Sequence, residues 1–200
     1  ESPKHGPRQL TINPANAVAS PFGWHDTNGA NGAEYQITRG NNVHAYLDRN
    51  GDNASDGGEP NGGTDLIFDF PFDPNTEPGA YTKAATVNLF YMNNMMHDNL
   101  YGFGFNEVAG NFQSNNYSKG GAANDQVLAE AQDGSGTDNA NFATPADGGN
   151  PRMQMFLWLS SGVETYISKP DSLAGAFESR RASGWGGAPP PPREAEVVIA

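Results

Sequence analysis

The chain has 200 residues, which is enough for one domain of ordinary size or for one domain and the start of another. Its 23 acidic residues outnumber its 11 Lys and Arg residues, and the resulting net charge of -12 argues against nucleic acid or an anionic membrane as a partner. The absence of Cys excludes disulfides, thiolate nucleophiles and Cys-ligated metals, so His and carboxylate side chains are the remaining candidate metal ligands.

The first third of the chain is predicted to be mostly β. Apolar residues alternate between Tyr35 and Leu47, and the turn signal at residues 39–42 divides this pattern into two short strands. Another strand is expected at residues 66–70, where Leu, Phe and Phe alternate with Ile and Asp before Pro71 ends the pattern.

One long helix is predicted from about Tyr81 to Tyr101, with Gly102 and Gly104 ending it. Apolar residues recur there at spacings of three and four, so this face is expected to lie against a sheet. The residues of the predicted face are Ala85, Leu89, Met92, Met96 and Leu100, and it is widened by Phe90, Tyr91 and Met95.

Two further strands are predicted after the helix, at residues 127–132 and 153–158, and they are expected to form a β-meander under it. The composition changes after Trp158, with a short polyproline run at residues 189–192 and a buried-strand pattern at 196–200. The sequence therefore predicts an α+β fold, with a mostly antiparallel sheet and one long helix, followed by the start of a second β-rich region.

The sequence supplies no catalytic residues for a zinc hydrolase. Such sites use two His at i and i+4 on one helix, and no two of the four His, at positions 5, 25, 44 and 97, have this spacing. His97 and Asp98 are neighbours on the predicted helix, where side chains point about 100° apart. We therefore expect that they do not hydrogen-bond as a catalytic dyad and that His97 is structural.

The strongest constellation is a loop with the spacing of a calcium-binding EF-hand loop. Asn53 stands at its sixth position, where Gly is usual, but Asn tolerates a left-handed backbone. Carboxylates folded together repel unless a cation holds them, which suggests calcium; the alternative is a solvated turn rich in Asp, Asn and Gly. The candidate ligands are Asp48, Asn50, Asp52, the carbonyl of Ala54, Asp56 and Glu59.

A second candidate is the segment that contains Asn139 and Ala140, which ends a polar loop and could pair with an extended peptide. Spacing alone does not distinguish such an edge from a structural turn into a strand.

Six motifs spread over residues 15–158 resemble the fungalysin family of secreted zinc metalloendopeptidases. They lie at Ala19–His25, Thr38–Asn42, Leu89–Tyr101, Ala109–Phe112, Ala131–Pro145 and Arg152–Met155. The resemblance implies a thermolysin-like fold, in which residues 1–158 are the N-terminal subdomain of the catalytic domain. It also implies that Asn139 and Ala140 match the Asn-Ala pair that binds the substrate backbone.

The resemblance further implies that the zinc ligands and the general-base Glu belong to a His-Glu-x-x-His helix and a later Glu, none of which is present in this sequence. A zinc-bound water deprotonated by that Glu would attack the peptide carbonyl. Residues 159–200 are similar to the opening of the protease-associated domain inserted in bacterial relatives, so we expect a truncated insert there.

The function expected from the sequence is therefore one part of a secreted, extracellular metalloendopeptidase that is inactive by itself. Its expected partners are a protein or peptide substrate and the remainder of the same catalytic domain, with no nucleic acid and no membrane. The alternative is a non-catalytic, calcium-stabilised extracellular binding or structural module.

Overall fold

The computed structural model describes residues 10–73, 75–159, 163–167 and 175–179. The chain divides into two compact units, Glu1–Leu157 and Trp158–Ala200. In the second unit, β5 (Val163–Ile167) and β6 (Gly175–Ser179) pair in antiparallel fashion. The strand expected at 196–200 and the polyproline run at 189–192 lie outside the described residues.

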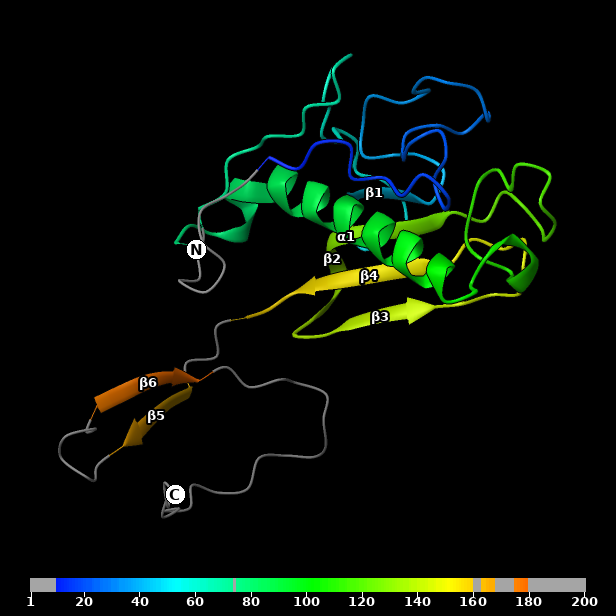
Figure 1. Ribbon diagram of the computed structural model, residues 1–200. Helices are drawn as coiled ribbons and strands as arrows, with labels where there is room; N and C mark the ends of the chain where they lie inside the picture. Colours follow the sequence, from blue (N-terminus) through cyan, green and yellow to red (C-terminus); the bar gives the residue numbers. More distant parts are fainter. Residues whose placement is uncertain (1–9, 74, 160–162, 168–174, 180–200) are drawn as a thin grey trace. The chain divides into compact units, whose positions relative to one another are not determined.

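The first unit is α+β, with a four-stranded sheet and a long helix, α1 (Thr82–Gly102), across one face of the sheet (Figure 1). The prediction of this helix is correct to within a residue or so at each end. The 3-10 turn η1 (Pro78–Tyr81) leads directly into it, and a second, η2 (Glu107–Ala109), follows it. No helix in the described part of the chain is long and apolar enough to span a membrane.

The sheet is mixed, so the predicted meander and the mostly antiparallel sheet are wrong. Its order is β1-β2-β4-β3, with β1 at Val43–Leu47, β2 at Val127–Thr137, β3 at Ala140–Ala143 and β4 at Arg152–Leu157. β1 pairs with β2 in parallel because α1 provides the crossover between them. β4 inserts between β2 and β3, parallel to β2 and antiparallel to β3.

The two strand predictions in the first third have different outcomes. Val43–Leu47 is β1, whereas the segment before the turn makes only isolated bridges, at Ile37 and Arg39. No strand forms at residues 66–70, since Leu66 has a left-handed φ of 54° and Ile67 N–H donates back to Gly62 in a turn.

The apolar core lies between α1 and the alternate residues of β1 and β2 that face it. Trp24 packs against this layer through edge-to-face ring contacts with Phe90 and Tyr91. The buried cluster comprises Trp24, Val43, Ala45, Leu89, Phe90, Val127, Ala129 and Ala131.

The helix buries only part of the predicted face: Leu89 and Phe90 lie in the core, and Tyr91 and Met95 pack against it. Met92, Met96 and Leu100 remain 40% to 55% exposed, while the fully or nearly buried residues are Thr86, Leu89, Phe90, Asn94 and Asp98. Polar burial is possible because each group finds a partner: Asn94, for example, donates to Phe90 C=O and accepts from Asn42 Nδ2 at 3.0 Å.

Candidate functional site

The predicted substrate-binding segment lies at the free edge of the sheet. Asn139 precedes β3, and Ala140 is its first residue. All four residues of β3 are exposed, and among the strands that the structure describes β4 is its only neighbour in the sheet. Phe142, on the same strand, is 43% exposed and contacts the ring of Phe112.

Hydrogen bonds fix which backbone groups of β4 face β3. Leu128 N–H on β2 donates to Pro151 C=O at 2.8 Å, so residues 151, 153 and 155 direct their backbone groups toward β2. Phe156 N–H donates to Asn139 C=O at 3.3 Å, so residues 152, 154 and 156 face β3.

This alternation leaves the backbone N–H and C=O of Ala140 and Phe142 directed away from β4, because they lie opposite Met155 and Met153. The N–H of Ala140 donates to its neighbour, the side-chain Oδ1 of Asn139, at 2.8 Å. The edge therefore directs the C=O of Ala140 and the N–H and C=O of Phe142 toward an added extended peptide, while the Asn139 side chain occupies the N–H of Ala140.

The predicted calcium loop folds as a series of local turns. Asn53 has the expected left-handed backbone, with a φ of 65°. Asn50 and Asp52 each accept a backbone N–H two residues ahead, and Asp56 accepts Arg49 N–H at 2.8 Å. Glu59 accepts Ser55 Oγ–H at 2.8 Å and lies 3.3 Å from His44 Nε2.

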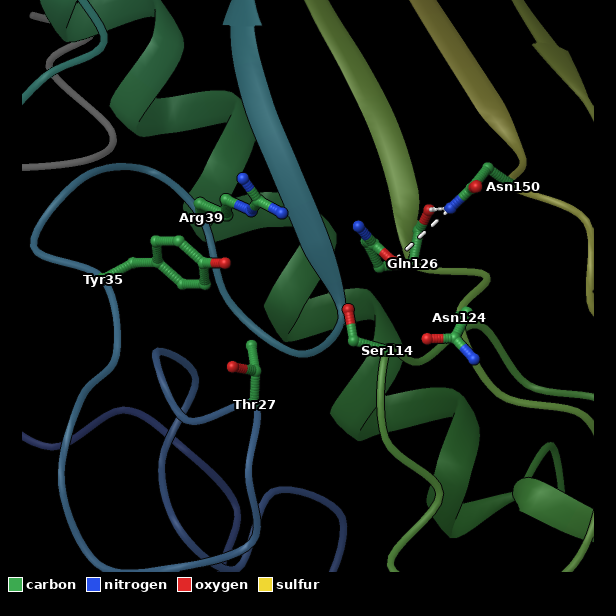
Figure 2. Close-up of a pocket in the computed structure, with 7 residues that line it drawn as sticks. All are labelled: Thr27, Tyr35, Arg39, Ser114, Asn124, Gln126 and Asn150. Carbon is green, nitrogen blue, oxygen red and sulfur yellow. Dashed lines mark hydrogen bonds between the residues drawn. The ribbon is translucent and has the colours of Figure 1, made fainter.

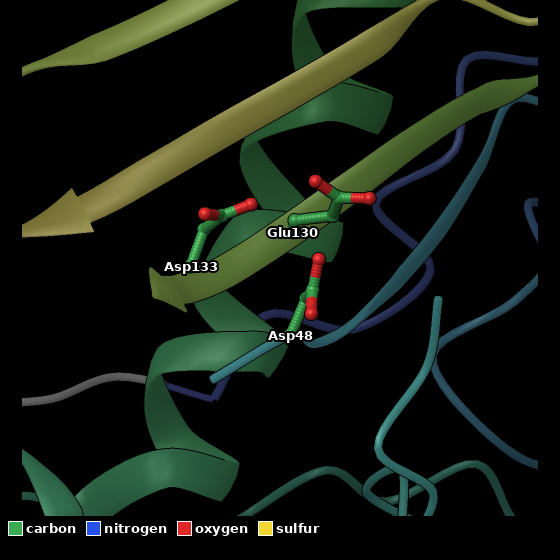
Figure 3. Close-up of side chains that lie close together, drawn as sticks. All are labelled: Asp48, Glu130 and Asp133. Carbon is green, nitrogen blue, oxygen red and sulfur yellow. The ribbon is translucent and has the colours of Figure 1, made fainter. Parts of the chain in front are cut away.

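Asp48 is the exception in this loop, since its side chain is buried rather than exposed. Its carboxylate accepts the N–H groups of Asp52 and Asn53, and it lies beside Glu130 and Asp133 of β2 (Figure 3). One carboxylate oxygen from each of the three lies within 4.8 Å of the others. Within the described ranges this is the only such group of three or more acidic or His side chains.

The sequence pattern did not predict Glu130 and Asp133 as partners of Asp48, because they lie about 80 residues from it along the chain. The available signal was Glu130 itself, a charged residue between Ala129 and Ala131 in the middle of a buried strand. The bulge that displaces Asp133 has no clear sequence signal, since its residue with positive φ is Gln132, at 52°, and not a glycine.

The groups around this acidic cluster offset only part of its negative charge. Arg152 Nη1 contacts Glu130 Oε1, and Tyr46 O–H donates to the same oxygen at 3.0 Å. Burial and the neighbouring Asp133 carboxyl raise the pKa of Glu130, although Tyr46 and Arg152 oppose this shift. The Gln154 amide donates to Asp133 Oδ2 at 2.8 Å.

The described His residues do not fit a catalytic zinc site. His25 packs against the rings of both Phe68 and Phe90, its Nδ1 bonds Arg39 C=O, and burial lowers its pKa to about 4. His44 faces the single carboxylate of Glu59. Neither is grouped with a second His or with a pair of carboxylates in the described part of the chain.

His97 is hydrogen-bonded, as predicted, and its structural role stays a prediction, but the expectation that it does not hydrogen-bond to Asp98 is wrong. Its Nδ1 lies 3.0 Å from Asp98 Oδ1, its Nε2 lies 3.4 Å from Asn111 Nδ2, and both side chains of the pair are buried. Asp98 in turn accepts hydrogen bonds from the N-terminal segment, so the pair anchors that segment to α1.

A polar cavity of about 360 Å³ lies at the opposite end of the parallel strands, where β1, β2 and β4 begin (Figure 2). Asn150 bridges to Gln126 C=O at 2.8 Å, and the Arg39 guanidinium lies over the Tyr35 ring. The cavity contains none of the residues predicted from sequence to form a site; its lining is Thr27, Tyr35, Arg39, Ser114, Asn124, Gln126 and Asn150.

Comparison with known proteins places these features in a family. The chain is 45% identical over 160 residues to extracellular metalloproteinase 5 of Trichophyton tonsurans, covering 80% of this chain and 26% of the relative. It is 43% identical over 166 residues to extracellular metalloproteinase 2 of Arthroderma benhamiae, covering 80% and 25%. The chain thus spans about a quarter of the length of these relatives.

The model of the fungalysin metallopeptidase (M36) family matches residues 1–175, which include the helix, the sheet and the edge strand β3. The chain belongs to the fungalysin metallopeptidase family.

Proposed function

We propose that this chain is part of a secreted, extracellular zinc metalloendopeptidase that hydrolyses peptide bonds in proteins. Its role is to hold the substrate backbone in extended form along β3, with Asn139 and Ala140 as the binding residues. The zinc ligands and the general base come from residues outside these 200, and the chain alone is inactive.

The observation that supports this role is the orientation of the edge strand. Ala140 and Phe142 direct their main-chain groups away from β4, and β3 is exposed along its whole length. A peptide added there completes a main-chain ladder, which gives affinity without requiring a particular side chain. Family membership and the names of the relatives agree with a peptidase.

The arrangement of the remaining parts belongs to the same proposal. Residues 1–158 correspond to a thermolysin-like N-terminal subdomain, and residues 159–200 begin a protease-associated insert of the type found in bacterial relatives. The partners are a protein or peptide substrate and the rest of the catalytic domain.

The second candidate is a non-catalytic extracellular module stabilised by calcium. The local turns of the 48–59 loop favour it, because one short segment holds several carboxylate and amide oxygens in the spacing of a calcium loop. In this case calcium binds through Asp48, Asn50, Asp52, Ala54 C=O, Asp56 and Glu59, and the complete protein cleaves no peptide bond.

The test uses the complete protein and an internally quenched peptide. Hydrolysis that a zinc chelator abolishes and added zinc restores supports the peptidase, whereas a zinc-replete protein that cleaves no peptide supports the module. Asn139→Ala should lower kcat/KM. The decrease should correspond to a loss of about 1 to 3 kcal/mol of transition-state stabilisation, the cost of a lost buried hydrogen bond in the substrate complex.

A matched control is Asn61→Ala. Like Asn139, Asn61 is exposed and its Oδ1 accepts a nearby backbone N–H at 2.8 Å, but it lies in the loop that bridges to Ile37. We expect the control to leave kcat/KM unchanged. An active enzyme in which Asn139→Ala also changes nothing refutes the edge-strand role while leaving the peptidase assignment intact.

A further inference from the structure

The acidic cluster formed by Asp48, Glu130 and Asp133 joins two parts of the chain that are distant in sequence. Asp48 follows β1, whereas Glu130 and Asp133 lie on either side of the bulge in β2. Their exposed fractions are 0%, 0% and 1%, so water does not screen the three carboxylates from one another. In Figure 3 the three carboxyl groups face a common space.

The positive charge beside the cluster is smaller than its negative charge. Arg152 is the only Lys or Arg side chain within ion-pair distance of these carboxylates among the described residues, and it contacts Glu130 Oε1. Asp48 and Asp133 are satisfied by backbone or side-chain donors that carry no charge. Three ionised carboxylates against one guanidinium leave two negative charges in a buried site.

An independent observation points to a ligand. Glu130 is fully buried, and no donor in the described part of the chain lies at hydrogen-bond geometry to its Oε2, whose polar neighbours are the Asp133 carboxyl and the Gln154 amide, whereas Oε1 has two donors. Native proteins rarely leave a buried carboxylate oxygen unpaired, because it loses its hydration without compensation. The unpaired Oε2 belongs to a carboxyl group of which one oxygen lies within 4.8 Å of an oxygen of Asp48 and of Asp133.

We propose that Asp48, Glu130 and Asp133 bind a hard divalent cation, and that this cation is calcium. Calcium takes carboxylate oxygens at 2.3 to 2.6 Å in irregular geometry, so two of its ligands are at most about 5 Å apart. The 4.8 Å limit on the oxygens of this cluster satisfies that condition. Magnesium keeps several of its waters, for which a buried site such as this leaves little room.

This site differs from the 48–59 loop in all but one of its ligands. The bound cation neutralises the two excess charges and ties the end of β1 to the bulge in β2. Its influence extends to the edge strand, because Gln154 donates to Asp133 and accepts from Asn141 Nδ2 of β3, each at 2.8 Å. The proposal does not depend on the peptidase function.

The experiment titrates the full 200-residue chain, freed of metal by EDTA and dialysis, with CaCl2 by calorimetry and with TbCl3 by luminescence. Tyr46 donates to Glu130, so excitation of tyrosine should sensitise emission from terbium bound at the cluster. We expect one site and an increase in Tm of about 5 to 10 °C at saturating calcium. A chain that binds neither ion overturns the proposal. In that case the carboxyl groups of Glu130 and Asp133 share a proton instead.

Substitutions distinguish the cluster from the loop. Glu130→Gln and Asp133→Asn keep the shape of each side chain and should each weaken calcium binding at least tenfold. Asp52→Asn and Asp56→Asn remove equal charge from the exposed loop and should leave the affinity within about twofold. The opposite pattern, with binding lost only in the loop variants, also overturns the proposal.

Circular dichroism of each metal-free variant confirms that it is folded before titration. Two cluster variants are needed because one of them could unfold. Loss of binding in either folded variant supports the cluster, and retained binding in both contradicts it.

Discussion

Asp98 and Glu130 are both carboxylates in the interior of the first unit, 8% and 0% exposed, yet their surroundings differ in the number of donors. Asp98 accepts four hydrogen bonds of 2.7 to 3.0 Å, from Asn16 N–H, Ser20 Oγ, Trp24 Nε1 and His97 Nδ1. Glu130 has donors on one oxygen only and faces two further carboxylates.

The difference appears in the proton affinities of the two groups. Burial acts to raise the pKa of Asp98, but the hydrogen bonds, led by that of His97, hold the pKa below its usual value. Burial and Asp133 raise the pKa of Glu130. Burial alone therefore does not distinguish a structural carboxylate from a ligand; the supply of donors around it does.

The largest effect is expected for Asp98→Ala. The substitution leaves the indole N–H of Trp24 and the other donors without an acceptor in the core, at a cost of about 3 to 5 kcal/mol of unfolding free energy. Urea denaturation measures it. The exposed Asp65→Ala is the control, expected to change stability by less than about 0.5 kcal/mol, and a similar loss in both variants would show that the donors are not decisive.

His25 gives the opposite case, a buried base without a carboxylate partner among the described residues, whose pKa is lowered by burial. The pKa of His25 is about 4 in the folded chain and 6.5 ordinarily, so protons bind preferentially to the unfolded chain. Stability should fall by about 3 kcal/mol as the pH drops from 6.5 to 4, since each pKa unit corresponds to about 1.4 kcal/mol.

Unfolding free energies measured between pH 7.5 and 4 check this, with His25→Phe as the comparison. Phe keeps a ring beside Phe68 and has no titrating nitrogen, so this contribution to the pH slope should disappear. Asp98 does not interfere in this window, because its contribution is lost only as the pH falls through its own lowered pKa. An unchanged slope would show that another group is responsible.

A moderate effect is expected for Gly134→Ala, which disturbs the backbone that holds the acidic cluster together. Gly134 N–H donates to Asp48 C=O at 2.8 Å, and an added Cβ would lie 2.0 Å from Arg49 C=O. The loop after β1 must move away from β2, which should cost about 1 to 3 kcal/mol and weaken calcium binding.

Gly102→Ala is the matched control for that change, because nothing lies within 4 Å of its added Cβ at the end of α1. It should leave thermal stability and calcium affinity almost unchanged. If Gly134→Ala destabilises the protein without affecting calcium, the cluster does not form the site.

The smallest effect is expected for Glu130→Gln in the presence of EDTA. Gln still accepts hydrogen bonds from Tyr46 and Arg152 through its oxygen, and the substitution removes one of three mutually repelling charges. The unfolding free energy should therefore change by less than about 0.5 kcal/mol. A loss above about 2 kcal/mol would make Glu130 a structural carboxylate like Asp98 and end the contrast between them.

The sequence by itself determined the elements that depend on local pattern. The helix of residues 82–102 follows from a 3.6-residue apolar period and from glycines at its end, both of which act within a few turns. The spacing of Asp48, Asn50 and Asp52 likewise predicted a turn-rich acidic loop, and Asn53 has the left-handed backbone expected of it. The roles assigned to Asn139 and Ala140 and to the calcium loop stay predictions.

Only the tertiary structure decided which partner each element meets. The helix buries Asn94 and Asp98 and leaves Met92 and Met96 exposed, because donors from segments more than 50 residues away satisfy the buried polar groups. The insertion of β4 between β2 and β3 is equally invisible to local periodicity, since it depends on pairing between distant strands.

The acidic cluster shows the same limit for the site. Asp48 was visible as one member of a loop, but its buried neighbours Glu130 and Asp133 meet it only because α1 carries the chain back to pair β2 beside β1. Local sequence fixes which side chains can carry charge. Their burial and mutual distance, which determine whether that charge requires a cation, arise from long-range packing.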